Sequence, residues 1–159
     1  MYFRLCGLSL LRLDVDTLNV VLCIIMFVII LHRVSAAEQT LIINTHNNYR
    51  AGTWDDEVAS IAQKWADNCV TSHDQNYNRF IPGRLQSGQN LYYGSAKVTW
   101  DQPINAWHSE VSDFTFGGSN NLGQVGHYTQ VVWAKSTKIG CGYAKCGSVY
   151  YYVCNYSPP

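Results

Sequence analysis

Residues 139–156 read IGCGYAKCGSVYYYVCNY, and this stretch decides the fold. Two runs rich in aromatic and β-branched residues flank Gly147 and Ser148, which predicts a β-hairpin with a two-residue loop. A glycine at the first loop position suits a type II′ turn. The register that follows places Cys141 directly opposite Cys154 in a non-hydrogen-bonded pair, whose Cα atoms lie about 4.5 Å apart. That separation is within disulfide range, so the sequence predicts a bridge between these two cysteines.

The remaining cysteines predict a second bridge. Cys146 lies on the same strand as Cys141, roughly 16 Å away at about 3.3 Å per residue, so these two cannot pair. Cys146 and Cys154 are similarly out of reach within the hairpin. By elimination Cys69 pairs with Cys146, which ties a helix predicted over residues 55–70 to the sheet.

Hydrophobic periodicity and turn residues divide the chain into helices first and strands last. Residues 55–70 carry one apolar stripe at helical spacing, with acidic residues in the first turn. Thr99 and Gln102 have the spacing of a capping box at the start of the third helix. The predicted helices cover residues 40–51, 55–70 and 99–114, and the predicted strands cover residues 89–94, 128–134, 139–146 and 149–156.

An apolar run at residues 20–31 has the character of a signal-peptide core. It is too short to span a bilayer comfortably, and the small residues Ala36 and Ala37 suit cleavage. The sequence therefore predicts a signal peptide at residues 1–36, with an uncleaved signal anchor as the alternative, and a domain at residues 38–157. The domain keeps an even number of cysteines, which indicates an oxidising compartment and a secreted, extracellular protein.

The charge balance argues against a nucleic acid as partner. The full chain of 159 residues has 11 basic and 11 acidic residues. Removal of the leader takes away three arginines and two aspartates, which leaves eight basic and nine acidic residues and a net charge of about −1. A nucleic-acid-binding domain would instead carry a clustered basic patch.

Three polar side chains form a candidate cleft. His73 lies one turn beyond Cys69, on the buried side of the second helix if that helix extends so far. Glu110 sits at the edge of the apolar stripe of the third helix, and His127, beside a predicted strand, is a candidate partner for this half-buried carboxylate. Two histidines and one carboxylate suit zinc with an open fourth position. Taken singly, each residue has a plainer interpretation as a helix cap, a solvated carboxylate or a structural histidine.

Six motifs follow one another in a fixed order through the predicted domain. They are HNNYR, WADNCVTSH, GQNLYYGS, AWHSEVSDF, GHYTQVVWAKSTKIGCGYAKC and YYYVCNY. This pattern resembles the CAP superfamily, the SCP-domain family of cysteine-rich secretory proteins, antigen-five allergens and plant pathogenesis-related proteins. The resemblance implies an α+β fold, an α-β-α sandwich in which helices flank a central antiparallel sheet.

The resemblance also implies a central cleft with two histidines and two acidic residues. The histidines match His73 and His127, and one acidic residue matches Glu110. The second is usually a glutamate in a GENL motif, where this sequence has Gln89 in SGQNL. A carboxamide cannot act as a general base and binds cations more weakly than a carboxylate. Zinc or another divalent cation could therefore bind, but none is expected to be required.

Two further departures from the family pattern concern a disulfide and the C-terminal end of the domain. Vertebrate cysteine-rich secretory proteins usually have a third disulfide, whose cysteines match Ser87 and Ser157. Both positions are serine here, so the bridge is lost as a unit. No C-terminal cysteine-rich domain is expected after residue 157, so channel-blocking activity is not carried over from the relatives.

These observations favour a secreted, monomeric, allergen-like binding module over an enzyme. The expected ligand-binding residues are His73, Gln89, Glu110 and His127. The expected partner is a sterol, another lipid or an extracellular protein. The alternative is a metal-dependent hydrolase or protease, in which the two histidines and the glutamate activate a zinc-bound water, and a third interpretation gives these side chains a purely structural role. His46 is expected on the surface, where it would serve as a control.

Overall fold

The computed structural model describes residues 19–21, 33–83 and 86–159. The chain divides into two compact units, Met1–His32 and Arg33–Pro159. In the first unit only residues 19–21 are described, and they are helical. Most of the predicted signal peptide therefore lies outside the described residues. Among the helices that the structure describes, none combines the length and apolar character needed to cross a membrane.

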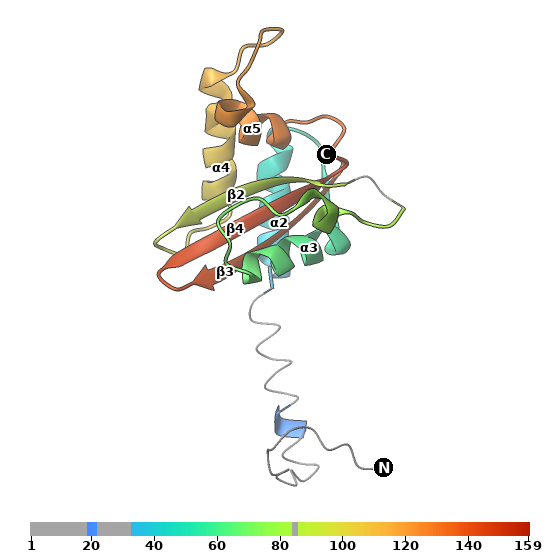
Figure 1. Cartoon of the computed structure of the whole chain (residues 1–159), viewed down its shortest axis with the longest axis vertical. Helices are drawn as coiled ribbons and strands as arrows, with labels where there is room; N and C mark the ends of the chain where they lie inside the picture. The colour runs from blue at the N-terminus through green and yellow to red at the C-terminus, as the bar shows by residue number, and fades with distance from the viewer. Residues whose placement is uncertain (1–18, 22–32, 84–85) are drawn as a thin grey trace. The chain divides into compact units, whose positions relative to one another are not determined.

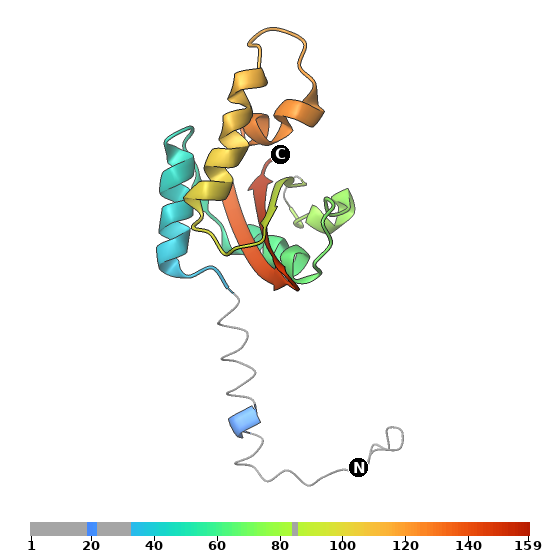
Figure 2. The same cartoon turned by 90° about the vertical axis from the view of Figure 1, so that its left-hand side faces the viewer.

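The second unit is a sandwich of three layers (Figures 1 and 2). In chain order its elements are α2 (Ala36–Asn47), β1 (Thr53–Trp54), α3 (Asp56–Asp67), the 3-10 helix η1 (Asn76–Arg79), β2 (Gly88–Gly94), α4 (Asp101–Ser109), the 3-10 helix η2 (Glu110–Asp113), α5 (Leu122–Val131), β3 (Lys138–Cys146) and β4 (Val149–Ser157). A four-stranded sheet lies in the middle, with α2, α4 and α5 packed on one face and α3 on the other. This arrangement confirms the predicted α+β class.

The C-terminal hairpin has the predicted register. β3 pairs antiparallel with β4 and places Cys141 opposite Cys154, and the two cysteines are bridged with their Cα atoms 4.1 Å apart. In the loop Gly147 has a φ of +62°, as the first position of a type II′ turn requires. The sheet order is β1-β3-β4-β2. One detail corrects the prediction: β1 pairs parallel with β3, so the sheet is mixed and not wholly antiparallel.

The second predicted bridge is also present, between Cys69 and Cys146. It joins the chain just after α3 to the last residue of β3, with Cα atoms 5.5 Å apart. The two bridges lie in different surroundings, because Cys141 and Cys154 are buried whereas Cys69 is exposed. The helix layer on this face is thus covalently tied to the sheet at one end.

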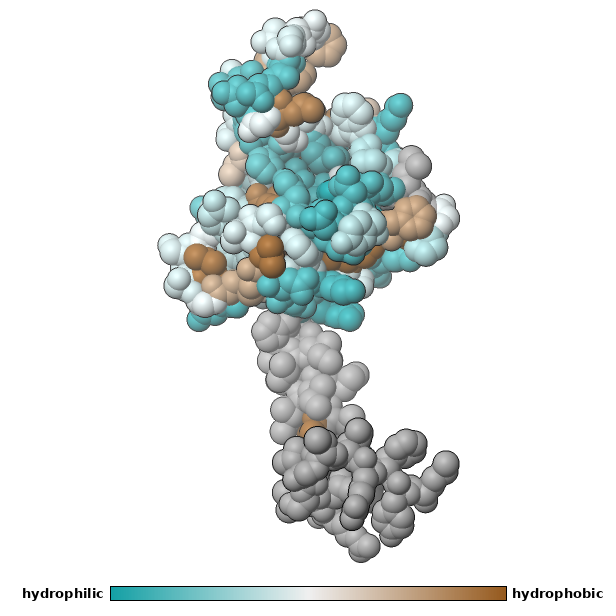
Figure 3. Space-filling model, viewed as in Figure 1, coloured by the Kyte–Doolittle hydropathy of each residue, from teal (hydrophilic) through white to brown (hydrophobic). Residues whose placement is uncertain are grey.

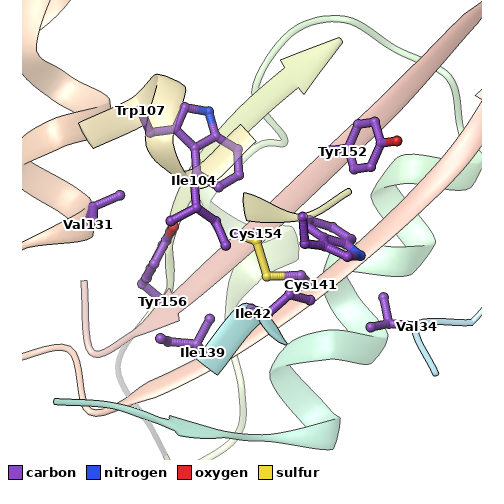
Figure 4. Packing of buried hydrophobic residues seen from close by; sticks show 11 residues of the cluster. Val34, Ile42, Ile104, Trp107, Val131, Ile139, Cys141, Tyr152, Cys154 and Tyr156 are labelled. Atoms are coloured by element: carbon purple, nitrogen blue, oxygen red, sulfur yellow. A yellow bond between two sulfur atoms is a disulfide. The ribbon is translucent and has the colours of Figure 1, made fainter. Parts of the chain in front are cut away.

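A hydrophobic core lies on each face of the sheet. The smaller one forms where alanines of α3 pack on β3 and β4. The larger one lies between the sheet and the helices α2, α4 and α5, and Figure 4 shows the buried disulfide among its side chains. Its buried members are Val34, Ile42, Trp100, Ile104, Trp107, Val131, Ile139, Cys141, Tyr152, Cys154 and Tyr156.

Gly140 and Gly142 allow α3 to lie directly on β3. A Cβ atom at Gly140 would come closer than 3.0 Å to the backbone of Ala59, and one at Gly142 would come as close to the backbone of Gln63. The side chain of Gln63 uses this approach, since its Nε2 donates to the carbonyl of Tyr143 (2.9 Å) and its Oε1 accepts the Tyr143 N–H (3.2 Å). The helix is therefore held on the strand both by close backbone packing and by side-chain bonds.

The segment around His127 is a helix, which corrects the strand predicted over residues 128–134. α5 begins after Asn121, whose side chain caps the first turn by accepting a backbone N–H (2.9 Å). Val125 and Val131 are its buried residues. β-branched and aromatic residues favour a strand by local propensity, but burial of these valines against the core requires a helix here.

The third predicted helix is shorter and starts differently. α4 ends at Ser109, and the chain continues from Glu110 as the 3-10 helix η2. The N-cap of α4 is Trp100, which makes no side-chain cap bond, so the capping box predicted at Thr99 and Gln102 does not form. The Gln102 N–H donates to the backbone carbonyl of Thr99 instead (3.0 Å). Burial of the Trp100 indole in the larger core sets this start.

α2 begins at the predicted cleavage position. Ser35 caps the helix and forms a capping box with Glu38. Ala36 and Ala37 lie in its first turn, and Val34, one residue before the cap, is buried in the larger core. The folded unit therefore contains residues on both sides of the expected cleavage position.

His46 is fully buried, which corrects its expected place on the surface. Its Nδ1 donates to the carbonyl of Ile42 (2.9 Å), and its Nε2 accepts from the hydroxyl of Tyr156 (3.0 Å). Because a carbonyl can only accept, Nδ1 carries a proton, and the lowered pKa of the ring leaves Nε2 unprotonated at neutral pH. Burial is the main cause that lowers the pKa of His46 to about 4; the bond to Ile42 raises it, and the charge of Arg50 lowers it.

Acid is expected to destabilise the protein through His46. A histidine in an unfolded chain has a pKa of about 6.5, whereas the pKa of folded His46 is about 4. The neutral ring contributes its full stability above about pH 6.5, and that stability is lost as the pH falls toward 4, at up to about 1.4 kcal/mol per pH unit. Urea unfolding at several pH values measures the loss. His46→Asn cannot titrate, so it should be less stable at neutral pH but less sensitive to acid; equal pH slopes would contradict this role.

Candidate functional site

His73 lies in the loop after α3 and bonds to β2. α3 ends at Asp67 and Cys69 has a φ of +56°, so the helix is shorter than the predicted 55–70 and does not extend to His73. The Nδ1 atom of His73 is 3.1 Å from Oε1 of Gln89. The same oxygen accepts the backbone N–H of Asp74 (3.0 Å). One carboxamide oxygen thus fixes both the histidine ring and the backbone beside it.

The contacts of Gln89 determine which nitrogen of His73 carries the proton. The backbone N–H of Asp74 can only donate, so the Gln89 atom beside it is the carbonyl oxygen. The Nε2 of Gln89 donates to Oδ1 of Asn155 (3.1 Å), which holds the amide in this orientation. The Nδ1 of His73 must then donate to Gln89, and the lone pair of the ring lies on Nε2.

Two donors anchor the loop that carries His73. The carbonyl of Ser72 accepts from Nε1 of Trp65 (3.0 Å) and from the hydroxyl of Tyr151 (3.3 Å). One donor comes from α3 and the other from β4. With the disulfide at the end of α3, these bonds hold the loop against both the helix and the sheet.

Glu110, the first residue of η2, joins that element to α5. Its Oε1 lies 2.7 Å from Nδ1 of His127, and its Oε2 accepts the backbone N–H of Tyr128 (3.0 Å). His127 is therefore the partner that the sequence predicted for this carboxylate. Because a carboxylate accepts, Nδ1 of His127 donates, so in the neutral ring the lone pair is on Nε2. The ring of Trp107 stacks on that of His127, with centroids 6.5 Å apart.

Asn90 and Trp107 are site residues that sequence reasoning missed. The Nδ2 of Asn90 donates to the carbonyl of His127 (3.0 Å), which fixes α5 to β2. Trp107 donates from Nε1 to the carbonyl of Leu91 (2.9 Å) while it stacks on the histidine. A signal was present: Asn90 directly follows Gln89, and Trp107 lies one helical turn before the glutamate.

The two histidines lie close enough to interact electrostatically. Burial is the main cause that lowers the pKa of His73; the bond to Gln89 raises it, and the positive charge of Arg79 and the neighbouring His127 lower it. With its pKa below the ordinary value for histidine, His73 is neutral at physiological pH. The ring therefore presents an unprotonated Nε2.

The arrangement differs from the three-ligand metal site predicted from the sequence. In the described part of the chain, no three His, Cys, Asp or Glu side chains form a group that could hold a metal ion. Glu110 uses its two oxygens on His127 and Tyr128, so it orients a histidine. The donors left for a cation are Nε2 of His73 and Nε2 of His127. Metal-binding histidines commonly have their other ring N–H held by an oxygen in this way.

The chain also matches a known protein family over most of its second unit. Residues 43–156 match the family model for the CAP family, described as the cysteine-rich secretory protein family. The chain belongs to the CAP family. The matched region runs from within α2 to β4 and includes all four predicted site residues, namely His73, Gln89, Glu110 and His127.

Among curated proteins, this CAP chain is similar to cysteine-rich secretory protein 3 of two mammals. It is 39% identical to that of Equus caballus over 137 residues, covering 76% of this chain and 56% of the relative. It is 40% identical to that of Homo sapiens over 137 residues, covering 76% of this chain and 55% of the relative. The chain thus spans about half the length of the curated relatives it matches.

Solved CAP structures share the fold. Venom allergen-like protein 4 of Schistosoma mansoni has a TM-score of 0.67 and 26% identity, covering 78% of this chain and 90% of that chain. NaASP2, crystallised with Zn2+, has a TM-score of 0.64 and 24% identity, covering 79% of this chain and 81% of that chain. At 24% identity, the similarity to NaASP2 shows the CAP fold and not a shared ligand.

Proposed function

We propose that this CAP domain is an extracellular, non-enzymatic binding module that holds a divalent cation between His73 and His127. The observation that carries the proposal is that both histidine rings are held in the same way, each by an oxygen at its Nδ1. Each Nδ1 bonds to an oxygen, 3.1 Å away on Gln89 and 2.7 Å away on Glu110. Neither Nε2 bonds to any described residue. Oxygens that accept the other ring N–H orient a histidine toward a metal and increase its basicity.

Two imidazole nitrogens suit a borderline cation such as zinc. Zinc is also the ion of the NaASP2 crystal structure, so it is the first ion to test. A site with two protein ligands leaves coordination positions for water or for a donor atom of a bound molecule. The cation would supply a Lewis-acidic link between the domain and that molecule. His73 and His127 would provide its protein ligands, and Gln89 and Glu110 would keep both rings in the correct tautomer.

The same geometry disfavours the alternative, a metal-dependent hydrolase or protease. Such an enzyme needs a general base within hydrogen-bond reach of the attacking water. Both oxygens of Glu110 are engaged by α5, and the carboxamide of Gln89 cannot take up a proton. Neither of the two positions at which CAP relatives carry acidic residues can therefore serve as the base.

Secretion is supported by the two disulfides and by the curated relatives, which are named as secretory proteins. Disulfides form and persist in oxidising compartments. A sterol or another lipid as a second ligand, and a monomeric state, stay predictions. Sedimentation with sterol-containing vesicles would measure the first, and light scattering the second.

Calorimetric titration of zinc into the disulfide-intact chain tests the cation site. We expect one ion per chain and loss of binding in His73→Ala/His127→Ala. His108→Ala is the matched control, because it also removes a histidine ring but not a proposed ligand. The His108 ring packs against Tyr49 and Tyr128, with centroids 3.7 and 5.4 Å away. The buried His46 cannot serve this purpose. Zinc binding that survives the double substitution, or that is absent from the unaltered chain, would refute the proposal.

Gln89→Glu is expected to tighten zinc binding about tenfold. A carboxylate accepts the Nδ1–H of His73 more strongly than a carboxamide, so it raises the pKa of His73 and makes Nε2 a better ligand. Asn155 can accommodate the change, because its Nδ2 has no partner among the described residues and can turn to donate to the new carboxylate. Competition against a chromophoric chelator measures the affinity, and an NMR titration measures the pKa. A raised pKa without tighter binding would contradict the assigned role of Gln89.

A further inference from the structure

The loop between η2 and α5 carries the most exposed large apolar side chain of the described residues. This apical loop, residues 114–121, projects beyond α4 and α5 at the end of the domain away from the sheet (Figure 1). Phe116 is 95% exposed, and Leu122, the first residue of α5, is 70% exposed. Brown, apolar surface is visible at this end of the molecule in Figure 3. Exposed apolar groups of this size gain free energy when a partner removes them from water.

Asn120 holds the apical loop in one conformation. Its Oδ1 accepts the N–H of Thr115 (2.8 Å), and its Nδ2 donates to the carbonyls of Thr115 (2.8 Å) and Gly118 (3.2 Å). A turn bond from the Gly118 N–H to the Thr115 carbonyl (3.1 Å) closes the loop, and Gly117 adopts the positive φ (+72°) at its tip. Phe116 is thus presented by a pre-organised loop, so little conformational entropy is lost when a partner binds it.

The sequence around the apical loop is free of lysine and arginine. Residues 101–134 contain neither of them, and Asp113, directly before the loop, carries a carboxylate. A surface of this charge is not attracted to anionic lipid headgroups or to phosphate backbones. It is complementary to a partner surface on which basic residues surround an apolar centre.

A protein pocket suits the apical loop better than a bilayer does. Phe116 and Leu122 offer less apolar surface than one long fatty-acyl chain, and a single such chain gives only marginal, reversible membrane binding. A protein interface gains more from the same side chains, because a few rigid aromatic residues in tight pockets carry most of its binding free energy.

We propose that the apical loop is a docking surface for an extracellular protein, with Phe116 seated in an apolar pocket and Asp113 facing basic residues on the rim of that pocket. Leu122 adds to the contact from the first turn of α5. The proposal does not depend on the cation site, because no apical-loop residue is a ligand there.

Photo-crosslinking tests the docking surface. The secreted chain carrying Phe116→p-benzoylphenylalanine is irradiated in the extracellular fluid of the cells that produce it. Tyr77→p-benzoylphenylalanine is the matched control, because Tyr77 on η1 is 76% exposed and lies outside the loop. We expect one major protein adduct at position 116 that is absent at position 77. The cross-linked protein is then purified for affinity measurements.

The affinity of the purified partner decides the proposal. We expect Phe116→Ser to weaken binding about tenfold or more, and Asp113→Asn to reduce its dependence on salt. Tyr77→Ser should leave binding unchanged. Equal adducts at both positions, or a partner that binds Phe116→Ser as well as the unaltered chain, would overturn the proposal. So would Phe116-dependent sedimentation with phosphatidylcholine vesicles, which assigns the loop to lipid, or a dimer that Phe116→Ser abolishes, which assigns it to a second copy.

Discussion

Gly140→Ala is expected to destabilise the protein by about 3 kcal/mol or more, or to prevent its folding. The added methyl group would overlap the backbone of Val58 and Ala59 in α3. Backbone atoms cannot rotate aside as side chains do, so the helix has to move away from β3. The smaller core then loses its packing along the whole helix. Urea unfolding of the oxidised protein measures the loss.

Gly126→Ala separates the effect of volume from the effect of losing a glycine. Gly126 lies inside α5, and nothing lies within 4 Å of a Cβ atom added there. The substitution should be neutral or stabilise the protein by about 0.5–1 kcal/mol, because alanine is the better helix former. Similar losses of stability from Gly140→Ala and Gly126→Ala would mean that α3 is not packed on β3 as closely as described.

Ser87→Cys/Ser157→Cys is expected to form a third disulfide and to stabilise the protein by about 3 kcal/mol. Gly88 pairs with Tyr156, so one residue further along Ser87 lies opposite Ser157. Residue pairs between β2 and β4 alternate between hydrogen-bonded and non-hydrogen-bonded. The pair of Ser87 and Ser157 is non-hydrogen-bonded, as is the bridged pair of Cys141 and Cys154 in the C-terminal hairpin. Both serines are buried, and the hydroxyl of Ser87 has no partner among the described residues. Sulfur at that position therefore replaces no side-chain hydrogen bond.

Thiol labelling of the denatured, non-reduced double variant measures whether the new bridge has formed. Urea unfolding of the same sample, compared with the unaltered chain, measures the gain in stability. Ser87→Cys alone is the control, because it makes the same local change and cannot form the bridge. It should show one free thiol more than the unaltered chain and no gain in stability. Two free thiols more than the unaltered chain, in the oxidised double variant, would contradict the register of β2 against β4.

The sequence predicts the hairpin well because its register is a local property. A two-residue loop at Gly147 and Ser148 fixes every pair along two strands, and both disulfides follow from that register. α5 could not be predicted in the same way. Its valines favour a strand by propensity, and burial of Val125 and Val131 in the folded domain makes the helix the better solution.

The candidate site shows the same division between local and tertiary information. Helical rotation places Glu110 beside the apolar stripe, and the pairing of this carboxylate with His127 follows from its need for a partner. The orientation of Gln89 does not follow, because it is set by the Asp74 N–H and by Asn155 on another strand. The burial of His46 could not be predicted from its local sequence, because the ring contacts Tyr156, which is far away in the sequence.

The position of β4 has a consequence for biosynthesis. This strand follows the other three in the chain, yet it lies in the interior of the sheet, between β3 and β2. Until Ser157 has been translated, β2 and β3 have no common neighbour on which to assemble. Until then β2 has no strand to pair with, and the unpaired edges of such an incomplete sheet are prone to aggregation. The four-stranded sheet can therefore be completed only after translation has passed β4.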